Sequence, residues 1–231
     1  MSFRGHPLAY PVTVTIGALA ISLAWAPFAD PELLGLLAAV ALIIVGYTVL
    51  RLAIAYSTAG TAAVFTRPGE PVRATEAGER DVTVRRVRQQ YRLVSRSWLE
   101  FVDGERTVWL PVFFDPALVI LTPTEAEFSG RAIRIGALRV YPAGRRRDSE
   151  PVGRLIDNPS RPDPDGVALA TTAARWRRRL LLDAQPAVAA PFAGLFWVYV
   201  AGGGPVAFTA ATVVAATTAT WLTAIRGSDP S

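Results

Sequence analysis

Apolar residues gather in four blocks, two near each end of the chain, and shorter apolar and polar stretches alternate between them. The first block, Leu8 to Phe28, contains no charged residue, and the second, Leu33 to Tyr56, contains only Arg51. A helix rises about 1.5 Å per residue, so about 20 apolar residues cross the roughly 30 Å hydrocarbon core of a bilayer. The pattern predicts a transmembrane hairpin over residues 8–56, with spans at about 8–28 and 33–56.

A cleaved signal peptide is the alternative interpretation of the first block. Only Arg4 precedes this block, no clear small-residue cleavage pattern follows it, and the second block begins within five residues. These features favour a membrane span.

The last two blocks predict a second transmembrane hairpin over residues 187–225, with spans at about 187–201 and 206–225. The third block is short, and Pro191 would either kink its helix or occupy the first turn. The sequence GGGP between the two blocks predicts a tight turn.

The distribution of arginine predicts the orientation of these spans. The connection between the first two blocks carries only Asp30 and Glu32, and the connection between the last two carries no charge. Cytoplasmic loops are enriched in basic residues. We therefore predict a multi-pass protein of the plasma (inner) membrane whose N-terminus, C-terminus and central domain face the cytoplasm.

The central segment has the pattern of a small antiparallel β-domain. Residues 57–80 predict a linker, because Pro, Gly and charged residues occur there without a period. Short alternating segments predict a barrel or sandwich over residues 81–142, with a hairpin turn at Asp103 to Arg106. The expected strands are 81–88, extending toward 95, then 98–102, 107–112, 117–121, 125–128, 132–135 and 138–141.

The expected fold class is therefore α+β: four transmembrane helices in two hairpins, with a small cytoplasmic antiparallel β-domain inserted between them. Residues 143–166 are rich in Arg, Pro and Asp and predict an irregular connection. Residues 167–184 predict a juxtamembrane helix. We expect the following side chains at the membrane surface, in contact with anionic lipid: Arg51, Arg175, Trp176, Arg177, Arg178 and Arg179.

The residue types exclude several kinds of active site. The chain has no cysteine and a single histidine, His6, so it cannot build a Cys-ligated metal site, a His-rich metal site or a Ser-His triad. It also lacks a glycine-rich phosphate loop. Glu125 and Glu127 share one face of an expected strand, where two acids are more often surface charge than a catalytic pair. We expect no enzyme activity, no cofactor and no metal site.

Composition adds a prediction about partners. All 24 basic residues are arginine, which is typical of a GC-rich coding genome such as that of an actinobacterium. The net charge of +5 fits a basic surface beside anionic lipid, and we expect no nucleic-acid partner. The run Arg145 to Arg147 is followed at once by Asp148 and Glu150, which favours a solvated loop over an anion-binding site.

Two further patterns have both a structural and a functional interpretation. Phe113 and Phe114 would form an exposed docking patch or part of the domain core, and the shared strand parity of Trp109 and Phe113 favours the core. Small residues at four-residue spacing let helices pack closely, within the bundle or against a larger membrane partner. These residues are Ala18, Ser22, Gly35, Ala39, Ala211, Ala215 and Ala219.

The layout of two spans, a cytoplasmic domain and two more spans, together with the Arg/Ala-rich composition, resembles the actinobacterial lipid-uptake coordinator proteins. These are accessory subunits of the Mce lipid importers. The segment WLEFVDGERTVWLPVFFDP is distinctive, but no catalytic role can be transferred to it. The resemblance implies a non-enzymatic subunit that docks on the permease of an ABC-type lipid transporter and helps to assemble or stabilise a complex importing fatty acids or sterols.

Two other hypotheses remain open at this point. One is an independent membrane-anchored β-domain scaffold of the NfeD-like kind, acting in membrane quality control. The other is an enzyme or regulator with an unrecognised carboxylate or arginine site, which predicts a concave polar pocket within residues 81–142.

Overall fold

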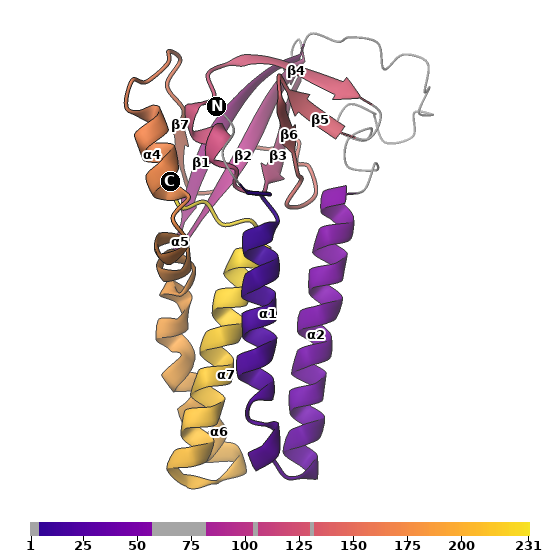
Figure 1. The fold of residues 1–231 in the computed structure, drawn as a ribbon, viewed down its shortest axis with the longest axis vertical. Helices are drawn as coiled ribbons and strands as arrows, with labels where there is room; N and C mark the ends of the chain where they lie inside the picture. Colours follow the sequence, from indigo (N-terminus) through magenta and orange to yellow (C-terminus); the bar gives the residue numbers. More distant parts are fainter. Residues whose placement is uncertain (1–4, 57–81, 104–105, 130–131) are drawn as a thin grey trace.

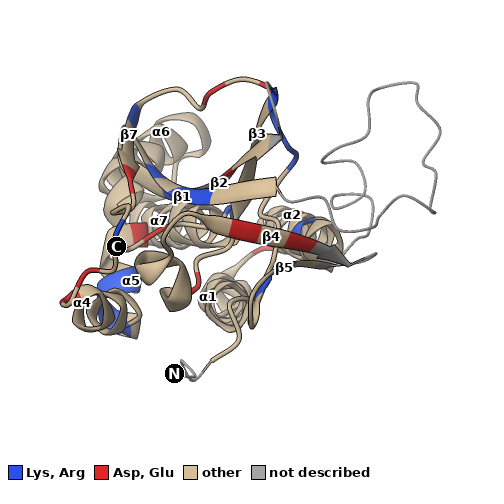
Figure 2. Ribbon diagram, turned by 90° about the horizontal axis from the view of Figure 1, so that it is seen from above, with Lys and Arg blue, Asp and Glu red and all other residues tan. Residues whose placement is uncertain are grey.

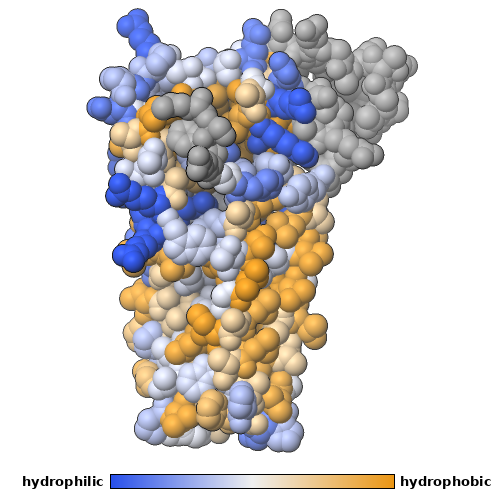
Figure 3. Space-filling view, viewed as in Figure 1, coloured by the Kyte–Doolittle hydropathy of each residue, from blue (hydrophilic) through white to orange (hydrophobic). Residues whose placement is uncertain are grey.

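The chain forms an elongated bundle of helices with a β-domain at one end (Figure 1). A computed structural model describes residues 5–56, 82–103, 106–129 and 132–231. Within these residues, four helical segments are long and apolar enough to span a membrane: 9–28, 31–56, 176–201 and 204–225. Their outer surface is largely apolar, whereas polar residues gather around the β-domain (Figure 3). The two predicted transmembrane hairpins are therefore confirmed.

The first hairpin is formed by α1 (Ala9–Leu23), a short 3-10 helix η1 (Ala26–Phe28) and α2 (Pro31–Tyr56). The turn before α2 is closed by Asp30, whose Oδ1 accepts a hydrogen bond from the Leu33 backbone N–H at 2.9 Å. A carboxylate at this position satisfies one of the free N–H groups of the first helical turn.

The second hairpin begins earlier than predicted. The helices α5 (Trp176–Asp183), η3 (Gln185–Ala189) and α6 (Ala190–Ala201) follow one another without a loop. Prolines fall in the first turns of η3 and α6, where a missing N–H does not break a helix. The chain then turns through three glycines with φ of +78°, +100° and +45° and enters α7 (Gly204–Ile225). Side chains disfavour this left-handed region, so glycine is required here.

Helix α7 is the centre of the bundle. It packs against α6 on one side and α1 on the other, while α2 makes its main helix contact with α1 (Figure 1). The bundle core is a cluster of buried apolar side chains from α1, α2 and the last turns of α7. Its members are Tyr10, Val14, Ala18, Ile44, Trp221, Ala224 and Ile225.

The β-domain is an antiparallel half-barrel, as the alternating pattern predicted. Its strands are β1 (Val82–Tyr91), β2 (Val94–Asp103), β3 (Arg106–Val112), β4 (Thr124–Ser129), β5 (Ala132–Ile135), β6 (Leu138–Val140) and β7 (Arg154–Asp157). They lie in the order β3-β2-β1-β4-β5-β6. The start of β1 pairs with β4, while the end of β1 pairs with β7 on the same edge. Strands β2 and β3 pair antiparallel as the predicted hairpin requires, with Asp103 opposite Arg106.

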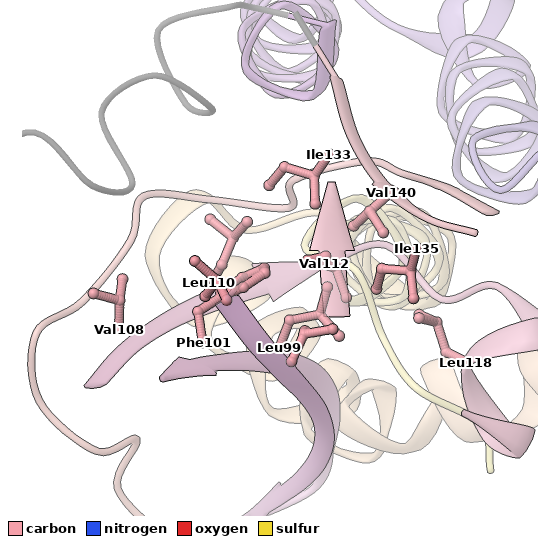
Figure 4. Packing of buried hydrophobic residues seen from close by; sticks show 12 residues of the cluster. Leu99, Phe101, Val108, Leu110, Val112, Leu118, Ile133, Ile135 and Val140 are labelled. Atoms are coloured by element: carbon pink, nitrogen blue, oxygen red, sulfur yellow. The ribbon is translucent and has the colours of Figure 1, made fainter. Parts of the chain in front are cut away.

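Alternate residues of the strands point into one apolar core (Figure 4). Leu99 and Phe101 of β2 face Val108, Leu110 and Val112 of β3 in this core. Trp109 lies on the other face of β3, where it packs with Val87 and Trp98. Phe113 and Phe114 are also buried, which contradicts an exposed patch. Phe113 nevertheless lies outside this core, in a cluster with Leu8 and Ala55 of the helical part, and not with Trp109 as strand parity predicted.

Several local predictions need correction. Residues 117–121 were expected to be a strand, but η2 (Pro116–Ile120) is a 3-10 helix. Asp115 starts it by accepting a hydrogen bond from the Ala117 N–H at 2.8 Å, and proline then favours a helical first turn. The connection 143–166 contains β7, and the helix expected over 167–184 is two helices, α4 (Gly166–Ala173) and α5, separated at an extended Arg175. The linker predicted at 57–80 lies outside the described residues.

Gly194 of α6 sets the distance between α6 and α7. A Cβ at this position would lie 3.0 Å from the Phe208 carbonyl oxygen and still closer to the Thr212 hydroxyl. We expect Gly194→Val to destabilise the protein by about 1–3 kcal/mol, because the helix backbones must separate to admit the side chain. Ala193→Val, one residue earlier on the exposed face of α6, is the control and should unfold at the wild-type temperature in detergent. Equal unfolding temperatures for both variants would contradict this account.

Candidate functional site: the junction between the β-domain and the spans

The segment that follows α7 folds back onto the β-domain. It turns at Gly227, which has φ of +79° and whose hydrogen faces the Ala143 side chain at a distance that leaves no room for a Cβ. The Asp229 backbone N–H then donates to the Ser95 carbonyl oxygen at 2.9 Å, and Ser228 forms a β-bridge with Arg96. The residues after α7 therefore pair with the beginning of β2 and so connect the fourth span to the β-domain.

Asp229 is the centre of a buried ionic cluster in this segment. Its Oδ2 accepts hydrogen bonds from Arg86 Nη2 at 2.5 Å and Ser97 Oγ at 2.6 Å, and the Arg86 and Asp229 side chains are 3% and 0% exposed. Its Oδ1 accepts from the backbone N–H of Ser231 at 2.9 Å. Burial alone would raise the pKa of Asp229, but Arg86 and the hydroxyl donors outweigh it and hold the pKa below its usual range.

Arg86 also connects the cluster to the outer part of the β-domain. Its Nη1 donates to Asn158 Oδ1 at 2.9 Å, and Asn158 Nδ2 in turn donates to the carbonyl oxygens of Leu118 and Leu121, each at 2.8 Å. These bonds join β1, the end of β7 and η2. A buried arginine keeps its charge at little cost only when its N–H groups are partnered, and this arrangement provides the partners.

A second buried carboxylate, Asp183 at the end of α5, joins the two hairpins. Its Oδ2 accepts hydrogen bonds from the Tyr10 hydroxyl of α1 at 2.6 Å and from Ser228 Oγ at 2.9 Å. The Arg179 guanidinium carbon lies 3.8 Å from the centre of the Tyr10 ring and 5.3 Å from that of Phe114. The first span, α5, the chain end and the β-domain thus meet at one point.

The N-terminal side of the junction is mainly aromatic and apolar. His6 Nε2 lies 2.9 Å from the Tyr141 hydroxyl, and the two rings are 4.7 Å apart. Below them is a buried cluster contributed by the start of α1, the end of α2 and the β-domain. Its members are Leu8, Ala55, Phe113, Tyr141 and Ala143.

Together these contacts hold the β-domain in one orientation on the bundle. Within the described ranges, no three His, Asp or Glu side chains are close enough to hold a metal ion. Glu125 and Glu127 of β4 are both exposed, and Figure 2 shows this acidic stretch at the outside of the molecule, as expected of surface charge. The chemistry of the junction is that of a structural connection.

The small residues predicted to pack helices divide into three groups. Ala18 and Ser22 of α1 are buried, with 2% and 0% exposure, and serve packing inside the bundle. The three alanines of α7, Ala211, Ala215 and Ala219, are half-buried. Gly35 and Ala39 of α2 are exposed. Only this last pair is left without a packing role among the described residues.

Gly35 and Ala39 belong to a longer face of α2. At about 100° per residue, positions 35, 39, 42 and 46 lie within roughly 60° of one another around the helix. The residues there are Gly35, Ala39, Leu42 and Gly46, all exposed, and a Cβ on either glycine would meet no atom within 4 Å. We call these four residues the small-residue face of α2.

The buried residues of α2 lie on the opposite side of the helix. They are Leu37, Ile44, Thr48 and Ala55, and Ile44 belongs to the core cluster shared with α1 and α7. Thr48 Oγ1 accepts a hydrogen bond from Trp221 Nε1 of α7 at 3.1 Å. Helix α2 therefore has one face fixed to the bundle and one face open.

The arginines predicted at the membrane surface do not all point outward. Arg175, Arg177 and Arg178 are exposed on α5, and Trp176 is partly exposed with its ring against Tyr10. By contrast, Arg179 is half-buried in the junction. Arg51 is also half-buried, and its Nε donates to the Ile225 carbonyl oxygen at 3.3 Å. Contact of the exposed set with lipid remains a prediction.

Sequence reasoning missed the residues of the ionic cluster. Asp229 lies in a short polar end with no motif, and its partner is 143 residues away. One signal was present, because Arg86 shares strand parity with the inward-facing Val82 and Val84. A charge at an inward position requires a buried partner. The identity of that partner depends on the fold.

Comparison with known proteins adds no assignment to this geometry, because no family model, curated protein or solved structure matches the chain. The structure defines its class as a membrane protein with four candidate spans and a β-domain between the two hairpins.

Removing the charge of Asp229 should destabilise the whole junction. We expect Asp229→Asn to lower the free energy of unfolding by about 3–5 kcal/mol, since it leaves the Arg86 charge buried without a counter-ion. Asp148→Asn breaks an exposed pair with Arg106 at 3.2 Å and should cost less than about 1 kcal/mol. The free energy of unfolding of both variants is measured by denaturant or thermal unfolding in the same detergent. An equal loss of stability in the two variants would refute the assigned role of the buried pair.

The same pair predicts a specific pH dependence. The folded-state pKa of Asp229 is depressed, so its contribution is complete above the unfolded-state value of about 3.9 and is lost as the pH falls through the folded-state pKa. The stability difference between wild type and Asp229→Asn should therefore be constant near neutral pH and shrink below about pH 4. A gap that stays constant down to pH 2 would contradict the pairing.

Proposed function

We propose that this protein is a non-enzymatic accessory subunit of a multi-component membrane complex and that it docks on its partner through the small-residue face of α2. The observation that carries the proposal is the placement of this face directly opposite the side of α2 that packs on α1 and α7. An internal packing role would have turned these residues inward.

Small residues on a span favour a helix as the occupant of this face. Glycine in a helix costs about 1 kcal/mol relative to alanine, and at Gly35 and Gly46 no atom of the described residues lies within 4 Å of where a Cβ would be, so close packing inside the described bundle does not require glycine there. Gly35, Ala39 and Gly46 let a second helix approach closely on either side of the exposed Leu42, and packing between backbones then stabilises the pair in lipid. The expected occupant is a transmembrane helix of another protein.

The junction supports this function by coupling the β-domain to the spans. The Arg86–Asp229 pair holds the domain against the segment after α7, and the Tyr10–Asp183 hydrogen bond joins the two hairpins beneath it. A partner bound to α2 would therefore meet the domain in a defined position. The distribution of arginine further supports a cytoplasmic location of the domain and of both chain ends.

The resemblance in layout to the lipid-uptake coordinator proteins supports a more specific proposal. The partner would be the permease of an Mce-type, ATP-driven importer of fatty acids or sterols, and this chain would help to assemble or stabilise that complex. An independent NfeD-like scaffold is the alternative, and the firmly seated β half-barrel favours it equally. The identity of the co-purified proteins separates the two.

Substitution on the open face of α2 tests the docking. We expect Ala39→Leu, and separately Gly46→Leu, to reduce the recovered partner by about tenfold or more, because a large side chain separates the two helices. Neither substitution should destabilise the monomer, because both positions face outward. The unfolding temperatures of both variants should therefore stay at the wild-type value. Ala193→Leu on the exposed face of α6 is the matched control.

The measurement is native purification with an affinity tag at the N-terminus, followed by quantitative mass spectrometry of co-eluting proteins. Ser231 is avoided as the fusion point, because its hydroxyl lies 2.6 Å from Arg86 Nη2. Recovery of a permease and an ATPase in near-equal amounts, lost in the α2 variants alone, supports the importer subunit. Recovery of proteases and chaperones only would favour the quality-control scaffold. Equal recovery from all variants would exclude α2 as the docking surface.

A further inference from the structure

A cavity of about 190 Å³ opens between the end of α2 and the β-domain, and its lining is strongly basic. Five arginines surround it, contributed by α2, by β2 and by the loop before β7. Its lining includes Arg51, Arg96, Arg147, Trp98 and Gly144. Arg145 and Arg146 complete the basic lining.

The side chains that line this cavity carry charge of one sign. Among the described residues that line it, none is Asp or Glu. The larger cavity of about 320 Å³ on the other side of the C-terminal segment differs, since Asp183 and Asp229 are part of its wall. Burial lowers the pKa of Arg96, and Arg226, Arg51 and Arg147 lower it further, with only Tyr47 acting in the opposite direction. The arginines here repel one another.

These side chains are held in place by contacts that do not involve an anion. Arg51 Nε donates to the Ile225 carbonyl oxygen at 3.3 Å, which brings Nη1 to 3.7 Å from the position of a Cβ on Gly144. Arg147 is fixed by paired backbone hydrogen bonds with Trp109 at 2.7 and 2.8 Å. Its guanidinium carbon lies 5.6 Å from the centre of the Trp98 ring. Arg51 and Arg147 are thus positioned at the cavity by contacts within the protein.

The chemistry of the cavity favours a phosphate group. Guanidinium groups bind phosphate through two parallel N–H donors, and several of them around one small volume match its tetrahedral oxygens. Arg51 lies five residues before the end of α2, which places the cavity about 7–8 Å from the helix end, near the level of lipid headgroups. An anion at this position would also relieve the mutual repulsion.

We propose that the cavity formed by Arg51, Arg96 and Arg147 is a binding site for a phosphate group, carried by an anionic lipid headgroup or by a soluble phosphate anion. This site is separate from the small-residue face of α2 and does not rest on the proposed docking function.

The test uses the full chain with the double variant Arg96→Gln/Arg147→Gln and the charge-matched control Arg134→Gln/Arg161→Gln, whose arginines are exposed elsewhere on the β-domain and its connection. Each protein is placed in nanodiscs of phosphatidylcholine with increasing phosphatidylglycerol, and unfolding temperature and retained lipid are measured. A parallel series in neutral detergent adds inorganic phosphate or pyrophosphate.

In neutral detergent without added anion, the site variant should unfold at or above the wild-type temperature, because substitution removes repulsion between cations. Phosphatidylglycerol should stabilise wild type and control, while the site variant should need about tenfold more of it for the same shift. This result identifies a lipid headgroup as the ligand. If instead the site variant needs about tenfold more pyrophosphate than wild type for the same shift, the ligand is a soluble anion. If the site variant and the control respond alike to every anion, the proposed site is overturned.

Discussion

The buried pair of Arg86 and Asp229 is the interaction on which the assembly of this structure depends. A β-domain inserted between two transmembrane hairpins is tethered at both of its ends, yet tethers alone do not fix its orientation. The ionic pair does so by placing a carboxylate from beyond α7 against the middle strand of the sheet, where hydroxyl groups and a backbone N–H also donate to it. Both charges are out of water, so neither can leave the other without a large desolvation cost. The pair consequently links the domain directly to the segment that follows the last span.

The four spans do not pack equally within the bundle. Helix α7 packs against both α1 and α6. Helix α2, by contrast, contacts the other helices along one face only, and small residues lie on its opposite face. A span with no internal role on that face can be occupied by lipid or by a partner. Because α2 also contributes Ala55 to the apolar part of the junction and Arg51 to the basic cavity, an event on its open face is connected to the domain through a single continuous helix.

Hydropathy and strand alternation predicted most of the fold. The spans followed from uncharged blocks of sufficient length, and the β-domain followed from its inward Leu, Val and Phe positions, because burial imposes these patterns directly on the sequence. Prediction failed where local chemistry competed with the pattern: Asp115 and Pro116 turned an apolar stretch into a 3-10 helix. It also failed where a function depends on contacts far apart in the chain. Neither Asp229 nor the convergence of Arg51, Arg96 and Arg147 has a local signal, whereas Gly35 and Ala39 were visible as a spacing but not as an open face.

The separation of Arg86 and Asp229 along the chain has a consequence for biosynthesis. The arginine leaves the ribosome 143 residues before the carboxylate that neutralises it, a delay of roughly 7–30 s at ordinary rates of translation. During that interval the sheet can form its apolar core, but Arg86 has no counter-charge and α7 is not yet anchored to the domain. Translation that stops within or before the fourth span therefore leaves a distinct intermediate with an unpaired internal cation.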